Sequence, residues 1–245
     1  MTTPTPAPTP SSNDIPVVTD AMRLVRVLFS PGAVFGEIQE RPTFWRPFLV
    51  VCIVNAVLQF FLRPFQQRIG QLMAERAGRP VPEPSTIKAA IGVVLSPLGP
   101  LVLCAIVGGI LYLLVSMFGG QTTYKKMLTV AIFTWPITLI QQAASVAVLS
   151  VRGAGSISGP QDLMVQLGAD LLLPADAQTG YFVRFLLAGI GPLPIWSLTI
   201  TAVGLMVLGK TGKSQAWTAA VIFFVIALLL GSGLGAFSMK MIGGS

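Results

Sequence analysis

Long apolar runs separated by short polar stretches dominate the chain from residue 46 onward. An α-helix rises 1.5 Å per residue, so about 20 apolar residues cross a hydrocarbon core roughly 30 Å thick. A segment in lipid must also satisfy its own backbone hydrogen bonds, which favours helices over isolated strands. The pattern therefore predicts an all-α fold, a polytopic membrane helical bundle of five transmembrane helices. The expected spans are residues 46–62, 100–118, 119–149, 193–208 and 216–237.

The third apolar run carries the clearest signals of its position. It opens with a polar turn that leads into Tyr124, Lys125 and Lys126. Aromatic and cationic side chains favour the membrane–water interface, and loops rich in Lys stay on the cytoplasmic side. Pro136 then removes a backbone donor, which lipid tolerates only where a neighbouring helix or side chain satisfies the freed carbonyl. This helix is therefore expected to pack against other helices.

Two amphipathic segments are predicted before the first span. Residues 1–18 are rich in Pro, Thr and Ser, which predicts a disordered tail, and they lack the features of a cleaved signal peptide. Residues 19–45 place apolar side chains at helical spacing beside Arg23 and Arg26, and Ser-Pro at Pro31 favours the start of a second short helix. We expect these helices to lie on the membrane surface, with a cytoplasmic partner-docking helix as the alternative. The apolar positions are Met22, Val25, Leu28, Phe29, Val34, Phe35 and Ile38.

Prolines mark the expected breaks after the first span. Pro64 is predicted to close that span, residues 66–79 to form a further amphipathic helix, and residues 87–95 to form a short apolar piece. A connection near residues 150–178 is long for a compact bundle, and connections of that length are often functional or mobile.

The fourth span follows an interrupted apolar segment that begins at Tyr181. Two interpretations are open: a short surface or re-entrant helix up to Ile190 followed by a span from Leu193, or one kinked and tilted helix. We favour the first, because two glycines and two prolines within six residues leave few intact helical hydrogen bonds. These breaking residues are Gly189, Gly191, Pro192 and Pro194.

Composition supports a membrane protein without visible catalytic machinery. Hydrophobic residues make up 53% of the chain and charged residues 10%, whereas about 25% charge is usual in soluble domains. The net charge of +7 comes from basic residues scattered beside apolar runs, which indicates headgroup anchoring and not nucleic-acid binding. Histidine is absent, and Cys52 and Cys104 both lie in apolar runs. We expect no enzyme activity, no cofactor and no metal.

Charge also predicts the orientation. The tight turn with Lys125 and Lys126 and the turn with Lys210 and Lys213 contain no acids and are expected in the cytoplasm. Five spans then place the N-terminus in the cytoplasm and the C-terminus outside. This orientation places the first connection outside although it contains five basic residues, which disagrees with the charge rule. Either an interfacial helix holds these charges at the outer headgroups, or the number of spans is different. The expected interfacial anchors are Trp45, Arg46, Tyr124, Lys125, Lys126, Lys210, Lys213 and Trp217.

Two glycine patterns suggest different roles, a phosphate-binding loop and helix packing. Residues Gly204 to Thr211 match a phosphate-binding loop, but that loop must be flexible and lead from a strand to a helix, whereas here the intervening residues end a span. No nucleotide is expected. Small residues that let helices approach are a better interpretation of Gly108 and Gly109, and of the pair Gly231 and Gly235.

Amide side chains inside the spans are candidates for contacts within the bundle, because polar groups in lipid bond across helices. These are Asn55, Gln59, Gln141 and Gln142. No carboxylate falls in a confident span, which argues against a proton-coupled transporter.

The layout resembles the Yip1-domain family of membrane proteins, in particular its bacterial branch. The resemblance covers about residues 20–237 and depends on the order and spacing of loose motifs. The motifs are Leu-Val-Arg-Val-Leu-Phe-Ser-Pro ending at Pro31, Phe-Trp-Arg-Pro ending at Pro47, Gly-Gly-Gln-Thr-Thr-Tyr ending at Tyr124, and the later Pro194-Ile-Trp196 and Ala216-Trp217.

This resemblance implies five spans, a cytoplasmic N-terminus and a membrane-embedded C-terminus. We expect the protein to lie in the bacterial plasma (inner) membrane. Eukaryotic members are linked to vesicle traffic and to Rab-type small GTPases. This chain has Thr-Phe-Trp-Arg-Pro where those members carry an Asp-Leu-Tyr-Gly-Pro type sequence, so a Rab-binding role is not carried over.

Two functions are compatible with these features. The first is a non-enzymatic protein that organises the membrane or recruits partners through its surface helices and glycine-rich bundle. Its partners would be the lipid bilayer and either a second copy of the chain or other membrane proteins. The second is a channel or transporter for a small or lipidic solute that uses the broken segment 189–194 and the intramembrane amides.

Overall fold

The structure is a computed structural model that describes residues 17–76, 78, 95, 97–163, 165, 167–173 and 180–243. The described chain is helical, as the sequence predicts. Its α-helices are α1 (Val17–Arg26), α2 (Pro31–Ile38), α3 (Trp45–Arg76), α5 (Leu98–Met117), α6 (Tyr124–Arg152), α7 (Tyr181–Ala188), α8 (Pro192–Leu208) and α9 (Lys213–Gly243), with short 3-10 helices at Ala154–Ser156, Pro160–Leu163 and Ala169–Leu172. The predicted tail lies outside the described residues except for Val17 and Val18, which already belong to α1. Most of residues 87–95 also lie outside them.

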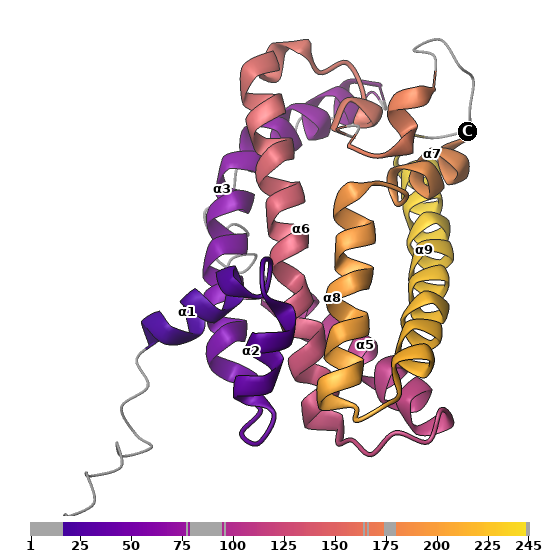
Figure 1. Ribbon diagram of the computed structural model, residues 1–245. Coiled ribbons are helices and arrows are strands. Elements are labelled where there is room, and N and C mark those ends of the chain that lie inside the picture. Colours follow the sequence, from indigo (N-terminus) through magenta and orange to yellow (C-terminus); the bar gives the residue numbers. More distant parts are fainter. Residues whose placement is uncertain are drawn as a thin grey trace, which may run out of the picture.

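Four helices, α3, α5, α6 and α9, are long and apolar enough to cross a membrane, and the bent pair α7 and α8 makes a fifth if it counts as one span. Helix α6 packs against α3, α5 and α8, and it lies between α3 and α8 in Figure 1. Its side chains Val130, Ile132 and Phe133 are fully buried. The bundle is therefore built around the helix that carries Pro136.

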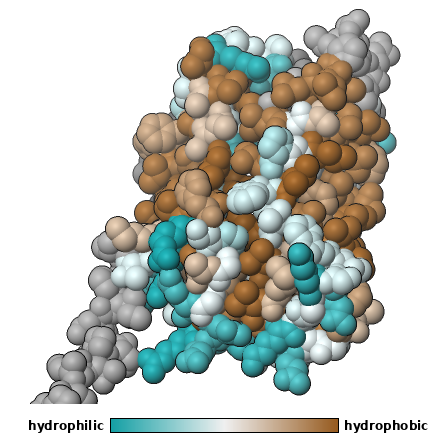
Figure 2. All heavy atoms as spheres, in the orientation of Figure 1, coloured by the Kyte–Doolittle hydropathy of each residue, from teal (hydrophilic) through white to brown (hydrophobic). Residues whose placement is uncertain are grey.

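An outward apolar surface surrounds this core. Figure 2 shows brown, hydrophobic side chains over the middle of the bundle and teal, hydrophilic ones at its lower end and again at its upper edge. Apolar side chains exposed along the long helices are typical of contact with lipid tails. They include Leu49, Ile53, Val57 and Phe61 on α3, Leu103, Ile106 and Leu113 on α5, and Val221, Val225 and Leu229 on α9.

The expectation that Pro64 ends the first helix is wrong. Helix α3 continues through Pro64 to Arg76, so the residues from Gln66 onward are its second half and not a separate helix. Figure 1 shows that half turning across the upper end of the bundle. The Gln66 amide donates to Gln59 Oε1 across the proline at 3.2 Å, and Phe65 is buried in a cluster with Leu149 and Ile157. Local side-chain bonding and packing preserve a helix that the sequence pattern alone would end.

The interrupted segment is broken into two helices, which fits either one bent span or a re-entrant helix before a span, so the favoured interpretation stays a prediction. The short helix α7 is followed by a 59° bend before α8, which begins at Pro192. In contrast, Pro136 does not interrupt α6. Two residues before it, the Thr134 hydroxyl donates to the Ala131 carbonyl at 2.8 Å.

The bend between α7 and α8 has a partner from the long connection. The Ala169 amide donates to the carbonyl of Ile190 at 2.7 Å. Gly168 lies so close to this bend that a Cβ there would be 2.7 Å from the Ala188 carbonyl oxygen. Asp170 is buried and accepts from the Gly168 amide at 2.9 Å, which fixes this turn. The described part of the connection is thus folded onto the break.

The two short turns lie together at the lower end. The Thr122 hydroxyl donates to the Leu208 carbonyl at 3.1 Å, and a Cβ on Gly120 would be 2.5 Å from Thr211 Cγ2. Both predicted lysine-bearing turns therefore share one end of the bundle. This agrees with their assignment to one side of the membrane, while the side itself stays a prediction.

We expect Gly168→Ala to lower the melting temperature and to speed amide exchange across the break of α7 and α8. The added methyl must displace backbone carbonyls, which typically costs about 1–3 kcal/mol. Gly155→Ala is the matched control in the same connection, because a Cβ there meets nothing within 4 Å. Equal melting temperatures for the two variants would contradict the close packing at Gly168.

Candidate functional site

Helix α2 buries its apolar side against the bundle. Val34, Phe35 and Ile38 are at most 2% exposed, and the Phe35 ring meets the Phe133 ring edge-on at 6.1 Å between centroids. The α2 helix packs on α8. Protein covers this face, so it is not available to lipid. Of the two predicted membrane-surface helices, only α1 still has an exposed apolar side. A period of apolar residues shows that a face will be covered but not what covers it.

Two side chains hold this N-terminal pair to α8 by hydrogen bonds to backbone carbonyls. The Trp196 indole N–H donates to Leu28 O at 2.9 Å. The Gln39 amide donates to Val207 O at 3.1 Å. Helix α2 is thereby fixed to α8 at both of its ends, through the turn before it and the residue after it.

Helix α1 and the turn after it have two apolar sides. Leu24 and Val27 face inward, at 5% and 0% exposure. Met22, Val25 and Phe29 are 61%, 58% and 79% exposed, and we call these three residues the α1 apolar face. An exposed apolar cluster beside cationic side chains is typical of a helix that lies in a membrane interface.

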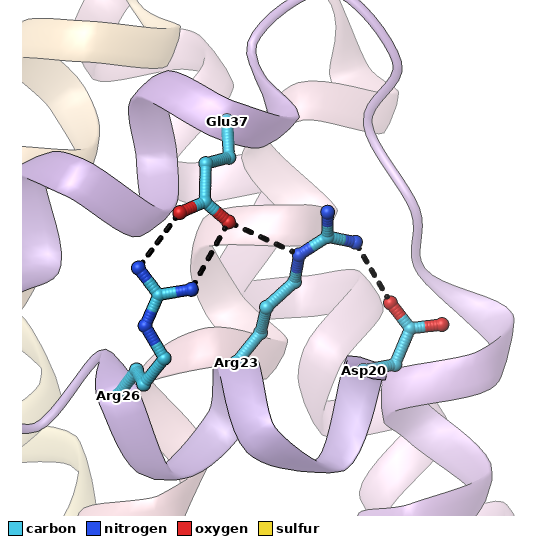
Figure 3. Close-up of polar contacts among 4 residues, drawn as sticks. All are labelled: Asp20, Arg23, Arg26 and Glu37. Carbon is cyan, nitrogen blue, oxygen red and sulfur yellow. Dashed lines mark hydrogen bonds and ion pairs between the residues drawn. The ribbon is translucent and has the colours of Figure 1, made fainter. Parts of the chain in front are cut away.

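An ion-pair cluster locks α1 to α2 (Figure 3). Arg26 contacts Glu37 at 2.8 Å, Arg23 contacts the same carboxylate at 3.4 Å, and Arg23 also reaches Asp20 at 3.2 Å. The hydrogen bond from Arg26, together with the charges of both arginines, holds the pKa of Glu37 below its ordinary value of 4.5. Asp20 is only 1% exposed. The cluster fixes the direction in which the α1 apolar face points.

A second set of features lies inside the bundle. The α3–α5–α6 cavity, about 610 Å³, is lined by Asn55, Gln59, Arg63, Trp135 and Gln142 together with apolar residues. Three of the four predicted amides therefore share one cavity. Gln142 Oε1 and Trp135 Nε1 are buried there without a hydrogen-bond partner among the described residues.

Gln141 faces other cavities, because adjacent helical residues point about 100° apart. The α6–α9 cavity, about 500 Å³, is lined by Gln141, Gly189, Pro194 and Ser232 among others. Ser232 is 2% exposed, and its hydroxyl lacks a partner among the described residues. A third cavity of about 290 Å³ is lined by both Gln141 and Gln142, so residues of α6 border all three.

The predicted packing glycines differ in their surroundings. A Cβ on Gly108 would be 2.9 Å from Leu128, and one on Gly235 would be 2.9 Å from Phe185. Gly109 has only Tyr124 at 4.0 Å, and Gly231 has nothing within 4 Å. The close approaches are therefore at one member of each predicted pair.

The predicted anchors lie at helix starts or in the turns. Trp45 is exposed, and the Tyr124 hydroxyl donates to Ala105 O at 2.9 Å. Arg46 lies at the first turn of α3 and Trp217 is half-buried near the start of α9. Lys125, Lys210 and Lys213 are exposed, and Lys126 is partly so.

The phosphate-loop look-alike has no loop where that motif needs one. Gly204 lies within α8, and a Cβ there would be 2.8 Å from Val130. No group of metal-binding side chains occurs in the part of the chain that the structure describes.

Several contributors were missed at the sequence level. Glu37, Asp20, Trp135 and the turn at Gly168 were not singled out, and Trp196 was quoted only as part of a motif. A Glu 11 residues after Arg26 gives no local pairing signal, because the contact depends on the turn between α1 and α2. Trp135 could have been found from its place one residue before Pro136 on the central helix.

Comparison with known proteins gives a consistent result. The model of the Yip1 domain matches residues 25–235. A curated relative, "Membrane protein YknW" of Bacillus subtilis (strain 168), is 29% identical over 222 residues, which cover 88% of this chain and 92% of the relative. No solved structure matches the chain.

We expect Glu37→Gln to loosen α1, because two arginines lose their shared carboxylate. Amide exchange in α1 should rise several-fold, with α6 unchanged. In the unmodified protein, the Glu37 contribution is complete above about pH 4.5, the ordinary pKa, and is lost as pH falls through the lowered pKa of the folded state. Glu40→Gln is the control, since Glu40 is exposed near the end of α2. Equal exchange in both variants would refute the lock.

Proposed function

This chain belongs to the Yip1-domain family of membrane proteins, and from that premise we propose that it is a non-enzymatic protein that organises a membrane, or recruits proteins to it, through the α1 apolar face. The observation that carries the proposal is the two-sided character of α1. One side is buried in the bundle, while Met22, Val25 and Phe29 stay exposed.

The inserted face would act as a wedge in one leaflet. Burying apolar side chains in lipid is favourable by about 25 cal/mol per Å² of area removed from water. A free amphipathic helix could adjust its depth, whereas α1 is held by the ion-pair cluster and by Trp196. Insertion would therefore be coupled to the position of the whole bundle.

The orientation is part of this proposal. The end with Lys125, Lys126, Lys210 and Lys213 would face the cytoplasm of a bacterial cell, because short basic loops are retained there. Helix α1 would then lie in the cytoplasmic leaflet, and the C-terminal end of α9 outside. The arginines in the second half of α3 would lie at headgroups of the outer leaflet.

We expect the triple variant Met22→Ser, Val25→Ser, Phe29→Ser to lose most of the ability to deform vesicles while the protein stays folded. Cryo-electron microscopy of proteoliposomes measures vesicle shape, and a melting curve checks the fold. This test is cleaner than deleting residues 20–40, which would also remove the buried side of α2.

The matched control is Leu171→Ser, Leu172→Ser, which removes two exposed apolar side chains in the connection between α6 and α7. It should behave as the unmodified protein. Vesicles of equal shape with the unmodified protein and the α1 variant would reject the wedge, and partner recovery with both proteins would then test recruitment.

A second candidate, transport of a small or lipidic solute, is favoured by the cavities along α6. The α6–α9 cavity joins the broken segment to Gln141 and to the buried Ser232 hydroxyl. Binding sites beside a break in a spanning helix are common in transporters.

For this candidate we expect Gln141→Leu to reduce solute flux into proteoliposomes at least tenfold, with Ser145→Ala as a control on the next turn of α6. Ions, glycerol and labelled lipids are the solutes to measure. No flux above that of empty vesicles with any of them would leave the wedge as the better proposal.

A further inference from the structure

The α3–α5–α6 cavity contains a cation inside a spanning helix. Arg63 lines it, and its guanidinium carbon lies 5.8 Å from the centre of the Phe60 ring. Among the described residues, no carboxylate lines this cavity. A cation in a membrane segment normally faces a counter-charge or a polar cavity, because its transfer into hydrocarbon is costly. The described lining of the cavity supplies polar groups but no counter-charge of its own, so an anionic ligand group would complete it.

The height of Arg63 in the bundle indicates where this anion would come from. Pro64 follows directly within α3, and Phe65 packs with Leu149 near the C-terminal end of α6. Figure 1 shows the C-terminal part of α3 turning across that end of the bundle. Arg63 is thus at the level where the helix leaves the long apolar part of the bundle. Asn55 lies on the same helix face, about 12 Å deeper by the rise of 1.5 Å per residue. The cavity extends from the expected headgroup level toward the hydrocarbon.

The polar groups of the cavity are of two kinds. Gln59 accepts from Gln66 through Oε1, which leaves its amide nitrogen as a donor, and Trp135 Nε1 is a buried donor without a partner among the described residues. Together with Arg63 these groups suit phosphate and ester oxygens. Gln142 Oε1 is a buried acceptor that needs a donor. A phosphate alone would leave that acceptor unpaired.

The remaining wall is apolar and opens sideways. Phe60 and Leu103 line the cavity and are 63% and 50% exposed on the outer surface of the bundle. A volume of about 610 Å³ is large enough for a headgroup and glycerol backbone, with acyl chains continuing along the exposed helices.

We propose that this cavity binds a glycerophospholipid whose headgroup carries a hydrogen-bond donor, as in phosphatidylglycerol or phosphatidylethanolamine. Arg63 binds the phosphate, Trp135 and Gln59 donate to phosphate or ester oxygens, and Gln142 accepts from the headgroup hydroxyl or ammonium. The acyl chains lie against Phe60 and Leu103. This site does not depend on the role proposed for α1, and binding alone does not require transport.

Native mass spectrometry of the full chain in detergent tests the site. Dioleoyl phosphatidylglycerol and phosphatidylethanolamine should bind tighter than phosphatidylcholine, whose headgroup has no donor. Arg63→Gln should raise the Kd for all three lipids by roughly tenfold to a hundredfold, as expected for a lost charged hydrogen bond. Arg68→Gln is the matched control, because it removes the same charge from the same helix outside the cavity. An unchanged Kd in Arg63→Gln would overturn the proposal.

A second variant keeps the test valid if Arg63→Gln does not fold. Gln142→Leu should remove the preference for phosphatidylethanolamine over phosphatidylcholine while leaving phosphate binding in place. Retention of the full preference would refute the assigned role of Gln142. Soluble glycerol 3-phosphate should not displace the lipid at millimolar concentration; displacement would mean that the site takes a free phosphate and not a membrane lipid.

Discussion

Backbone groups in hydrocarbon have no water to bond, and this constraint governs the architecture of the bundle. Continuous helices satisfy it within α3, α5, α6 and α9. The bend between α7 and α8 does not, and there the protein supplies a partner, because the Ala169 amide donates to Ile190 O at 2.7 Å. The described part of the connection between α6 and α7 therefore packs on this bend, and the missing side chain of Gly168 lets it approach.

The N-terminal helices α1 and α2 are also held by contacts with the bundle. Helix α2 packs its apolar side on the bundle, and two hydrogen bonds join this pair to α8, one from the Trp196 indole and one from the Gln39 amide. The ion-pair cluster pairs the arginines of α1 with Glu37 and Asp20, while Arg26 itself stays 52% exposed. The surroundings therefore meet the α1 apolar face beside a paired, exposed cation. An apolar surface beside cationic side chains is typical of interfacial helices, and it is the reason for proposing a membrane role for α1.

Sequence patterns predicted the class of fold, because apolar runs of spanning length have few alternatives. They also located the break at Gly189 to Pro194, since glycine and proline act through local geometry. They were wrong at Pro64, where the outcome depends on a Gln66–Gln59 bond and on packing with residues 154–165. They identified the amides but not the cavities that each one lines: Gln142 lines the α3–α5–α6 cavity, Gln141 lines the α6–α9 cavity, and both line the third cavity. Covering partners, such as α8 over α2, are non-local and leave no trace in a single helix pattern.

The order of the chain also matters for the bend between α7 and α8. Residues 168–170 are synthesised before α7 and α8, so the amide that will satisfy Ile190 exists before the broken segment reaches the bilayer. Chains generally assemble from the N-terminus during synthesis. The bend between α7 and α8 therefore meets a hydrogen-bond donor that is already present in the chain when the bend is synthesised. The position of residues 168–170 upstream of the break is what makes this order possible.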